Sequence, residues 1–121
     1  MPYSETLAHR IREQLADLPN IEEKPMMGGL VFMYNNKMYV GIMQDELMCR
    51  IDPDLHEQAV EKNGCRTMQF ANRPMTGYIL VDDTARRTPQ QFDYWINLAL
   101  DFNPRANASK KKSKSKAKEN V

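Results

Sequence analysis

Two adjacent glycines, Gly28 and Gly29, are the first residues whose spacing suggests chemistry. A glycine-rich loop can hold phosphates when it follows a strand, opens a helix and carries a nearby lysine and hydroxyl group. Gly28 and Gly29 instead precede a strand-like run, without a lysine or hydroxyl group at the required spacing. The pair therefore favours a kink or bulge where a strand begins over a nucleotide site.

A series of methionines suggests a second kind of chemistry, the binding of a soft metal by thioethers. Four of them recur every five residues: Met33, Met38, Met43 and Met48. Thioether sites usually also contain histidine or cysteine, and both histidines, His9 and His56, fall on predicted helices. The series therefore favours flexible core packing or an adaptable binding surface over a metal site.

The two cysteines do not predict a reactive thiol. Cys49 falls within a predicted strand, where cysteine usually behaves as a small buried apolar residue. Cys65 follows the end of a predicted helix, where the helix dipole does not stabilise a thiolate. The sequence also lacks an assembled set of nucleophile, base and metal ligands. We therefore expect a protein that is not an enzyme and that has no cofactor.

Charge is distributed unevenly along the chain. Residues 1–103 contain 10 basic and 15 acidic side chains, whereas residues 104–121 contain seven basic side chains and one acid. The basic residues of this segment are Arg105, Lys110, Lys111, Lys112, Lys114, Lys116 and Lys118. Such a segment is expected to be disordered and to contact nucleic-acid phosphates without sequence preference. An anionic membrane surface, an acidic protein or no dedicated partner are the alternatives.

Helical patterns predict three helices that would position these residues. The first begins at Ser4 as N-cap and is closed by Pro19. A short middle helix is expected between Asp52 and Gly64, and residues 21–25 are expected to be a linker. The last helix begins with a capping box at Thr88 and ends at Pro104.

Two strands are predicted between Gly29 and Met43, around a turn at Asn35 and Asn36. Asparagine tolerates the positive φ angles that a two-residue hairpin turn requires. This pairing would place Val31, Met33, Met38, Val40 and Ile42 on one face, and Leu30, Phe32, Tyr39 and Met43 on the other. Because both faces are apolar, we expect helices to cover one of them. A homodimer interface or a groove would then account for the second face.

The remaining strands complete the predicted fold. Residues 47–51 form a third strand, residues 67–70 a short strand or extended segment, and residues 78–82 a buried strand after a turn at residues 73–75. The predicted fold class is α+β, with an antiparallel sheet formed by a three-strand meander and a further strand. No run of about 20 apolar residues predicts a membrane span. Together with the two cysteines, this favours a soluble cytoplasmic protein.

Three segments resemble the TfoX N-terminal domain family, also called the TfoX/Sxy competence-regulator family. They are "KPMMGGLVFMYNNKMYVGIM", "DELMCRID" and "RPMTGYILVD", followed by a tryptophan-containing helix. Met27 stands where the family usually has phenylalanine, and Asn36 where it often has glycine. The residues that match the family pattern are Met26, Gly28, Gly29, Lys37, Arg50, Arg73, Pro74, Met75, Gly77, Tyr78 and Trp95.

The resemblance implies a secretion-chaperone-like α+β domain over residues 1–103, without catalytic residues or a cofactor. Longer family members act as transcriptional coregulators of competence genes and carry a second, helical domain, whose place the basic segment 104–121 takes here. We therefore expect a regulatory module that binds a protein partner through an apolar sheet face and the turn at residues 73–75. The alternative is a small enzyme, or a protein that binds a small anion or other ligand, with a pocket near Gly28, Gly29 and Arg73.

Overall fold

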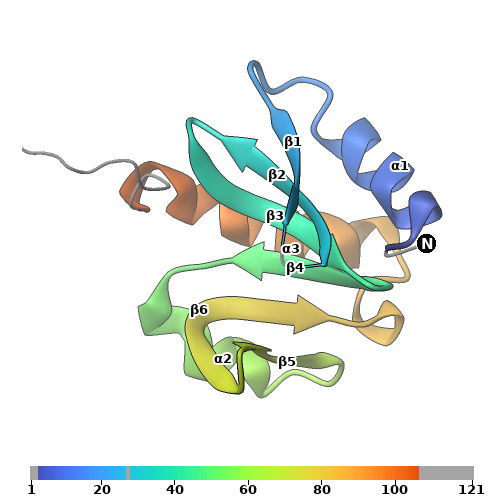
Figure 1. Ribbon diagram of the computed structural model, residues 1–121. Helices are drawn as coiled ribbons and strands as arrows, with labels where there is room; N and C mark the ends of the chain where they lie inside the picture. The colour runs from blue at the N-terminus through green and yellow to red at the C-terminus, as the bar shows by residue number, and fades with distance from the viewer. Residues whose placement is uncertain (1–2, 27, 107–121) are drawn as a thin grey trace, which may run out of the picture.

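The computed structural model describes residues 3–26 and 28–106, which form one six-stranded antiparallel sheet and three α-helices (Figure 1). The strands are β1 (Glu22–Met26), β2 (Gly29–Tyr34), β3 (Lys37–Met43), β4 (Glu46–Arg50), β5 (Cys65–Phe70) and β6 (Arg73–Val81). The helices are α1 (Glu5–Gln14), α2 (His56–Val60) and α3 (Pro89–Phe102), with short 3₁₀ turns η1 (Pro53–Leu55), η2 (Asp83–Ala85) and η3 (Asn103–Arg105). The order of strands in the sheet is β1-β2-β3-β4-β6-β5. The α+β fold class is confirmed.

The predicted helix starts are confirmed by their caps. Ser4 Oγ accepts a hydrogen bond from the backbone N–H of Leu7 at 3.2 Å, which satisfies a donor at the start of α1. The capping box at α3 is complete, because Thr88 accepts from Gln91 N–H while the Gln91 side chain accepts from Thr88 N–H. The helices therefore begin where local side-chain chemistry specifies.

The hairpin between β2 and β3 turns at Asn35 and Asn36, which have φ angles of 57° and 64°. Met33 pairs with Met38, as predicted, but Phe32 then pairs with Val40 because Tyr39 is an extra residue in β3. This β-bulge shifts the rest of the register by one residue. As a result, the predicted positions of Val40, Ile42 and Met43 are wrong: the first two face the helices, and Met43 faces away from them.

Two further strand predictions require correction. Residues 21–25 are not a linker, because Glu22–Met26 form the edge strand β1 against β2. Their charges and proline are typical of a protected edge rather than of a buried strand. Residues 73–75 are also not a turn. The turn lies at Ala71 and Asn72, which have positive φ angles, and β6 already begins at Arg73.

The sheet separates two apolar clusters. The larger one contains the apolar faces of α1, α2 and α3, packed against side chains from the sheet such as Phe32, Ile42 and Ile79. In Figure 1, α3 passes behind the sheet, so that the helices gather on one side of it. The second cluster contains only strand residues and occupies the opposite face. Among the described residues, no helix is long and apolar enough to cross a membrane.

Candidate functional site

The sheet face opposite the helices is rich in methionine. All seven methionines among the described residues lie in its cluster: Met26, Met33, Met38, Met43, Met48, Met68 and Met75. Val31, Leu80 and Tyr78 complete the cluster, which we call the methionine surface. The larger, helix-side cluster contains no methionine from the described part of the chain. Within residues 3–26 and 28–106, methionine is therefore confined to one face of the sheet.

The methionine surface has a buried centre and an accessible border. Met33 and Met48 are 2% and 0% exposed, whereas Met38, Met43 and Met75 are only partly buried. The side chains at the centre are covered by their neighbours on the same face, since this cluster consists only of strand residues. Unbranched thioethers can adopt several rotamers and fit irregular apolar surfaces, so the border is suited to an adaptable contact.

Charged side chains lie at the margins of the methionine surface. Arg66 of β5 forms a two-fold ion pair with Glu46 of β4. The guanidinium of Arg50 lies 5.4 Å from the centroid of the Tyr78 ring, a cation–π contact across β4 and β6. These contacts place polar groups beside an apolar centre, an arrangement that protein interfaces share.

Gly28 lies in the turn between β1 and β2, and Gly29 is the first residue of β2, so the pair is not a phosphate loop. Gly28 has a φ angle of 79°, which L-residues rarely adopt. A Cβ atom on Gly29 would lie 2.0 Å from the carbonyl oxygen of Ile42, so only glycine lets β3 approach this closely. The element after the pair is strand β2 and not a helix. Both glycines therefore have a structural explanation.

The structure does not bring the glycine pair and Arg73 together. Gly29 lies beside the Ile42–Met43 end of β3, which continues across β4 to Val81 at the end of β6. Arg73 begins β6 and therefore lies at the opposite end of that strand. The three cavities described below are lined by other residues.

The segment from Arg73 to Gly77 is held by a histidine that the sequence did not identify as important. His56 is 4% exposed, and its Nδ1 accepts the backbone N–H of Gly77 at 2.9 Å. Because Gly77 N–H can only donate, Nε2 must carry the ring hydrogen and donate to Thr67 Oγ1 at 2.8 Å. Gly77 has a φ angle of 90°, and its carbonyl accepts the N–H of Ile51 at 2.8 Å. The only local indication of this network was a histidine on an apolar helix face.

Lys37 and Trp95 also have structural partners. Lys37 Nζ donates to the carbonyl oxygens of Asn103 and Pro104, at 3.0 and 3.2 Å, where it stabilises the end of α3. Asn103 is 2% exposed and donates to the carbonyl of Tyr34, which ties the same helix end to the β2–β3 hairpin. The Trp95 indole N–H donates to the carbonyl of Ala85 at 2.9 Å.

The chain is similar to a known protein family over most of its length. The family model of the TfoX N-terminal domain matches residues 13–103. The chain belongs to this family. The matched range covers all six strands, α2 and α3, but only the end of α1. No curated protein and no solved structure matched the sequence at a significant level.

In this TfoX N-terminal domain, the family-pattern residues do not converge on one pocket. Met26, Met75 and Tyr78 belong to the methionine surface, and Arg50 contacts Tyr78 beside it. Others hold the frame: Gly29 at a close strand contact, Gly77 beside His56, Lys37 at a helix end and Trp95 in the helix-side core. Arg73 and Pro74 are exposed at the start of β6, next to Met75. Family membership thus indicates a regulatory or interaction module in general terms.

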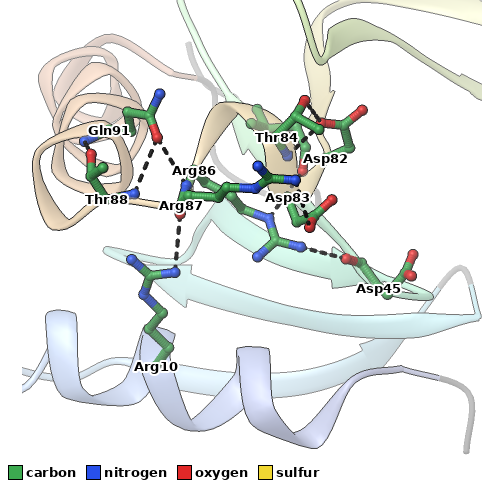
Figure 2. Close-up of polar contacts among 10 residues, drawn as sticks. Arg10, Asp45, Asp82, Asp83, Thr84, Arg86, Arg87, Thr88 and Gln91 are labelled. Carbon is green, nitrogen blue, oxygen red and sulfur yellow. Dashed lines mark hydrogen bonds and ion pairs between the residues drawn. The ribbon is translucent and has the colours of Figure 1, made fainter.

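A polar junction joins α1 to the β3–β4 turn and to the segment before α3 (Figure 2). Arg10 donates to the carbonyl of Arg86 at 3.0 Å, and Arg86 donates to the carbonyls of Val81 and Asp45 at 3.3 and 2.7 Å. Burial lowers the pKa of the Arg86 guanidinium below its ordinary value. The adjoining cavity of about 370 Å³ is also lined by Asp45, Glu46, Asp82 and Asp83. Because these acids repel anions and the guanidiniums bond to carbonyls, the junction serves to connect elements.

The two thiols lie in the helix-side core. Cys49 is fully buried, and burial raises the pKa of its thiol far above the ordinary value. Burial, helped by Asp82, raises the pKa of Cys65 to about 11. Both groups are therefore protonated near neutral pH, where a thiol is a poor nucleophile. Within the described ranges, no group of three or more histidine, cysteine or acidic residues could hold a metal ion.

Arg105 belongs to the folded body and not to a free basic segment. Its guanidinium donates to Asp52 at 2.6 Å and to Asp101 at 3.0 Å, and it lies 5.3 Å from the ring centroid of Phe102. The body continues through η3 to Ala106, which is 7% exposed. The six lysines from Lys110 to Lys118 fall outside the described residues.

Proposed function

We propose that this TfoX N-terminal domain is a non-enzymatic, cytoplasmic interaction module whose methionine surface docks an apolar segment of a partner protein. The observation that carries the proposal is the confinement of all seven described methionines to the sheet face opposite the described helices. Packing alone does not explain this confinement, because a helix-side core accepts methionine equally well. An adaptable apolar face explains it, since such faces can fit a partner without a fixed shape.

The position of Met75 supports the same proposal. Met75 is partly buried in the methionine surface and follows Arg73 and Pro74, which are exposed. The start of β6 therefore extends the apolar surface toward a cation and a proline. This places one family-pattern segment, from Arg73 to Met75, at the margin of the proposed contact, where polar interactions help to set orientation.

A regulatory role in transcription is the finer part of the proposal, and its support is the composition of the basic segment. Six lysines within residues 110–118 would contact phosphates of DNA or RNA without reading bases. This weak affinity would keep the docked partner near nucleic acid. A chain that ends at Ala106 should lose the binding of a random-sequence duplex, and the binding of the full chain should weaken steeply between 50 and 200 mM salt. Equal binding by both chains would contradict the role of this segment.

The docking proposal is tested by variants that place charge on the methionine surface. The full chain carrying Met38→Lys and Met75→Lys is compared with a matched control carrying Ala16→Lys and Asn97→Lys, both exposed on the helix side. We expect a partner that is captured by the wild-type and control chains from a lysate to be lost from the methionine variant. Circular dichroism and thermal unfolding establish that both variants are folded. Equal capture by both variants would contradict the proposal.

A second copy of the chain is the alternative occupant of the same face. Light scattering after size-exclusion chromatography separates the two outcomes. Under the proposal, the protein stays monomeric at high concentration. A dimer that dissociates in the Met38→Lys, Met75→Lys variant, but not in the control, would assign the methionine surface to self-association instead.

A further inference from the structure

A groove between α2 and α3 is lined by aromatic, apolar and uncharged polar side chains and by one lysine. A cavity of about 420 Å³ lies between the end of the α2 segment, η2 and the first turns of α3. A smaller cavity of about 150 Å³ adjoins it, with Leu55, Ala59 and Leu98 in its wall. Both cavities are lined by Lys62 and Tyr94, so these two side chains stand between them. The groove therefore lies among the helices, on the side of the sheet opposite the methionine surface.

The cation in this groove lacks an acidic partner. Lys62 Nζ lies 5.3 Å from the ring centroid of Tyr94, and within residues 3–26 and 28–106 it forms no ion pair with a carboxylate. No other lining residue of either cavity is charged. A lysine that no carboxylate neutralises, beside cavities without an acidic lining residue, attracts a small anion.

The aromatic wall of the groove is also exposed. Tyr94 is 45% exposed, one of two large apolar or aromatic side chains with this much exposure in the described part of the chain. Its ring meets the buried Trp95 ring edge to face, with 4.9 Å between the centroids. A ring that is fixed by such a contact offers a stacking surface at a low cost in conformational entropy.

Carboxamide groups supply the remaining polar contacts. Asn63 and Gln90 line the larger cavity, and their side chains form no hydrogen bond with another described residue. Each carboxamide offers both donors and an acceptor, which suits ring nitrogens, hydroxyl groups and carbonyl groups of a ligand. A ligand here would thus find one cation, one aromatic face and two amides within a single cavity.

From this arrangement we propose that the groove is a binding site for a small molecule with a planar ring and an anionic group. The ring would stack on Tyr94, and the anionic group would bind Lys62. Because Nζ of Lys62 lies 5.3 Å from the Tyr94 ring centroid, ring and anion must be separated by only a few bonds. A nucleoside monophosphate and an aromatic carboxylate both have this chemistry, and the volume of about 420 Å³ accommodates either.

Calorimetric titration of the full chain with six probes tests the site. The probes are adenosine monophosphate, adenosine, inorganic phosphate, 4-hydroxyphenylacetate, its neutral amide, and 4-methylcyclohexaneacetate, which keeps the acid without an aromatic ring. We expect at least one of the two ring-containing anions to bind with a dissociation constant below about 1 mM, a range usual for small ligands. Its neutral and ring-free counterparts should bind about tenfold more weakly. Which of the two anions binds shows whether the site takes a nucleotide or an aromatic acid.

Variants locate the binding. Lys62→Gln should weaken binding about tenfold, because a charge-assisted contact is lost, and Lys62→Arg should restore most of it. Tyr94→Leu should have a similar effect through lost stacking, whereas Tyr94→Phe should retain the affinity. Lys24→Gln on the exposed edge strand β1 is the matched control and should change nothing.

The single tryptophan provides a second, independent measurement of ligand binding. The Trp95 indole N–H gives one nuclear magnetic resonance signal, which should shift when a ring stacks beside Tyr94. The proposal is overturned if neither anion binds below about 1 mM. It is also overturned if Lys62→Gln or Tyr94→Leu binds as the wild type does, or if the ring-free anions bind as tightly as the ring-containing ones.

Discussion

Replacement of His56 by phenylalanine tests the network that holds the start of β6. The substitution keeps a buried ring of similar size but removes both ring nitrogens. Gly77 N–H, which is buried and donates to Nδ1 at 2.9 Å, would lose its acceptor. A buried donor without a partner costs about 1–3 kcal/mol, so we expect the free energy of unfolding to fall by about 2 kcal/mol.

The second hydrogen bond of His56 serves as the internal control. Thr67 is only half-buried, so its hydroxyl can bond to water when the ring is replaced. Thr67→Val should therefore lower the free energy of unfolding by less than about 1 kcal/mol. The difference between the two variants isolates the bond to Gly77.

Urea unfolding followed by Trp95 fluorescence measures both changes. For a domain of this size, about 2 kcal/mol corresponds to a decrease in the melting temperature of about 8–16 °C. The role assigned to the bond between His56 and Gly77 is contradicted if the free energy of unfolding of His56→Phe lies within about 0.5 kcal/mol of the wild-type value. It is also refuted if Thr67→Val is destabilised as strongly as His56→Phe, because the effect would then not depend on Gly77.

Other single contacts can be tested by substitution or by labelling. Gly29→Ala should lower the free energy of unfolding in urea by more than about 2 kcal/mol, because its Cβ would lie 2.0 Å from the Ile42 carbonyl oxygen. Gly28→Ala should lower it by only about 1 kcal/mol, since its Cβ meets open space and only the positive φ is unfavourable. Equal losses in the two variants would contradict this. Lys37→Met should lower the free energy of unfolding by about 0.5–1 kcal/mol, measured by thermal unfolding, since the end of α3 loses its cation. An unchanged melting temperature would show that this contact does not stabilise the protein. The pKa of Cys65 is raised to about 11 from an unfolded value near 9, so its contribution to stability is present below pH 9 and is lost as the pH rises to 11. A thiol reagent at pH 8 should therefore label neither cysteine until urea unfolds the chain. Rapid labelling of the native protein would contradict the burial of both cysteines.

Local signals in the sequence specified much of the fold. Ser4, Thr88 and the Asn35–Asn36 turn were identified correctly because each satisfies a need within a few residues of itself, a helix donor or a positive φ. The edge strand β1 was missed because an edge strand needs charge and tolerates proline, which also describes a linker.

Features that depend on residues far apart in the sequence could not be predicted from local signals. The bulge at Tyr39 lets its hydroxyl reach the carbonyl of Ile96 on α3, a partner 57 residues away, and nothing near Tyr39 indicates it. The bulge then decides which residues join the methionine surface, so the sequence predicted two apolar faces but assigned Met43 to the wrong one. His56 and Asn103 were overlooked for a similar reason, since their importance lies in backbone groups brought to them by the fold.

Docking of a partner on the methionine surface can be followed by the methyl resonances of the full chain during titration with the captured partner. Isotope-labelled methionine methyl groups report on the proposed contact, and isoleucine methyl groups such as those of Ile11 and Ile96 report on the helix-side core. Docking on the methionine surface should shift or broaden the resonances of Met38, Met43 and Met75 and leave those of Ile11 and Ile96 unchanged. Shifts confined to the isoleucines, with the methionine resonances unmoved, would contradict it.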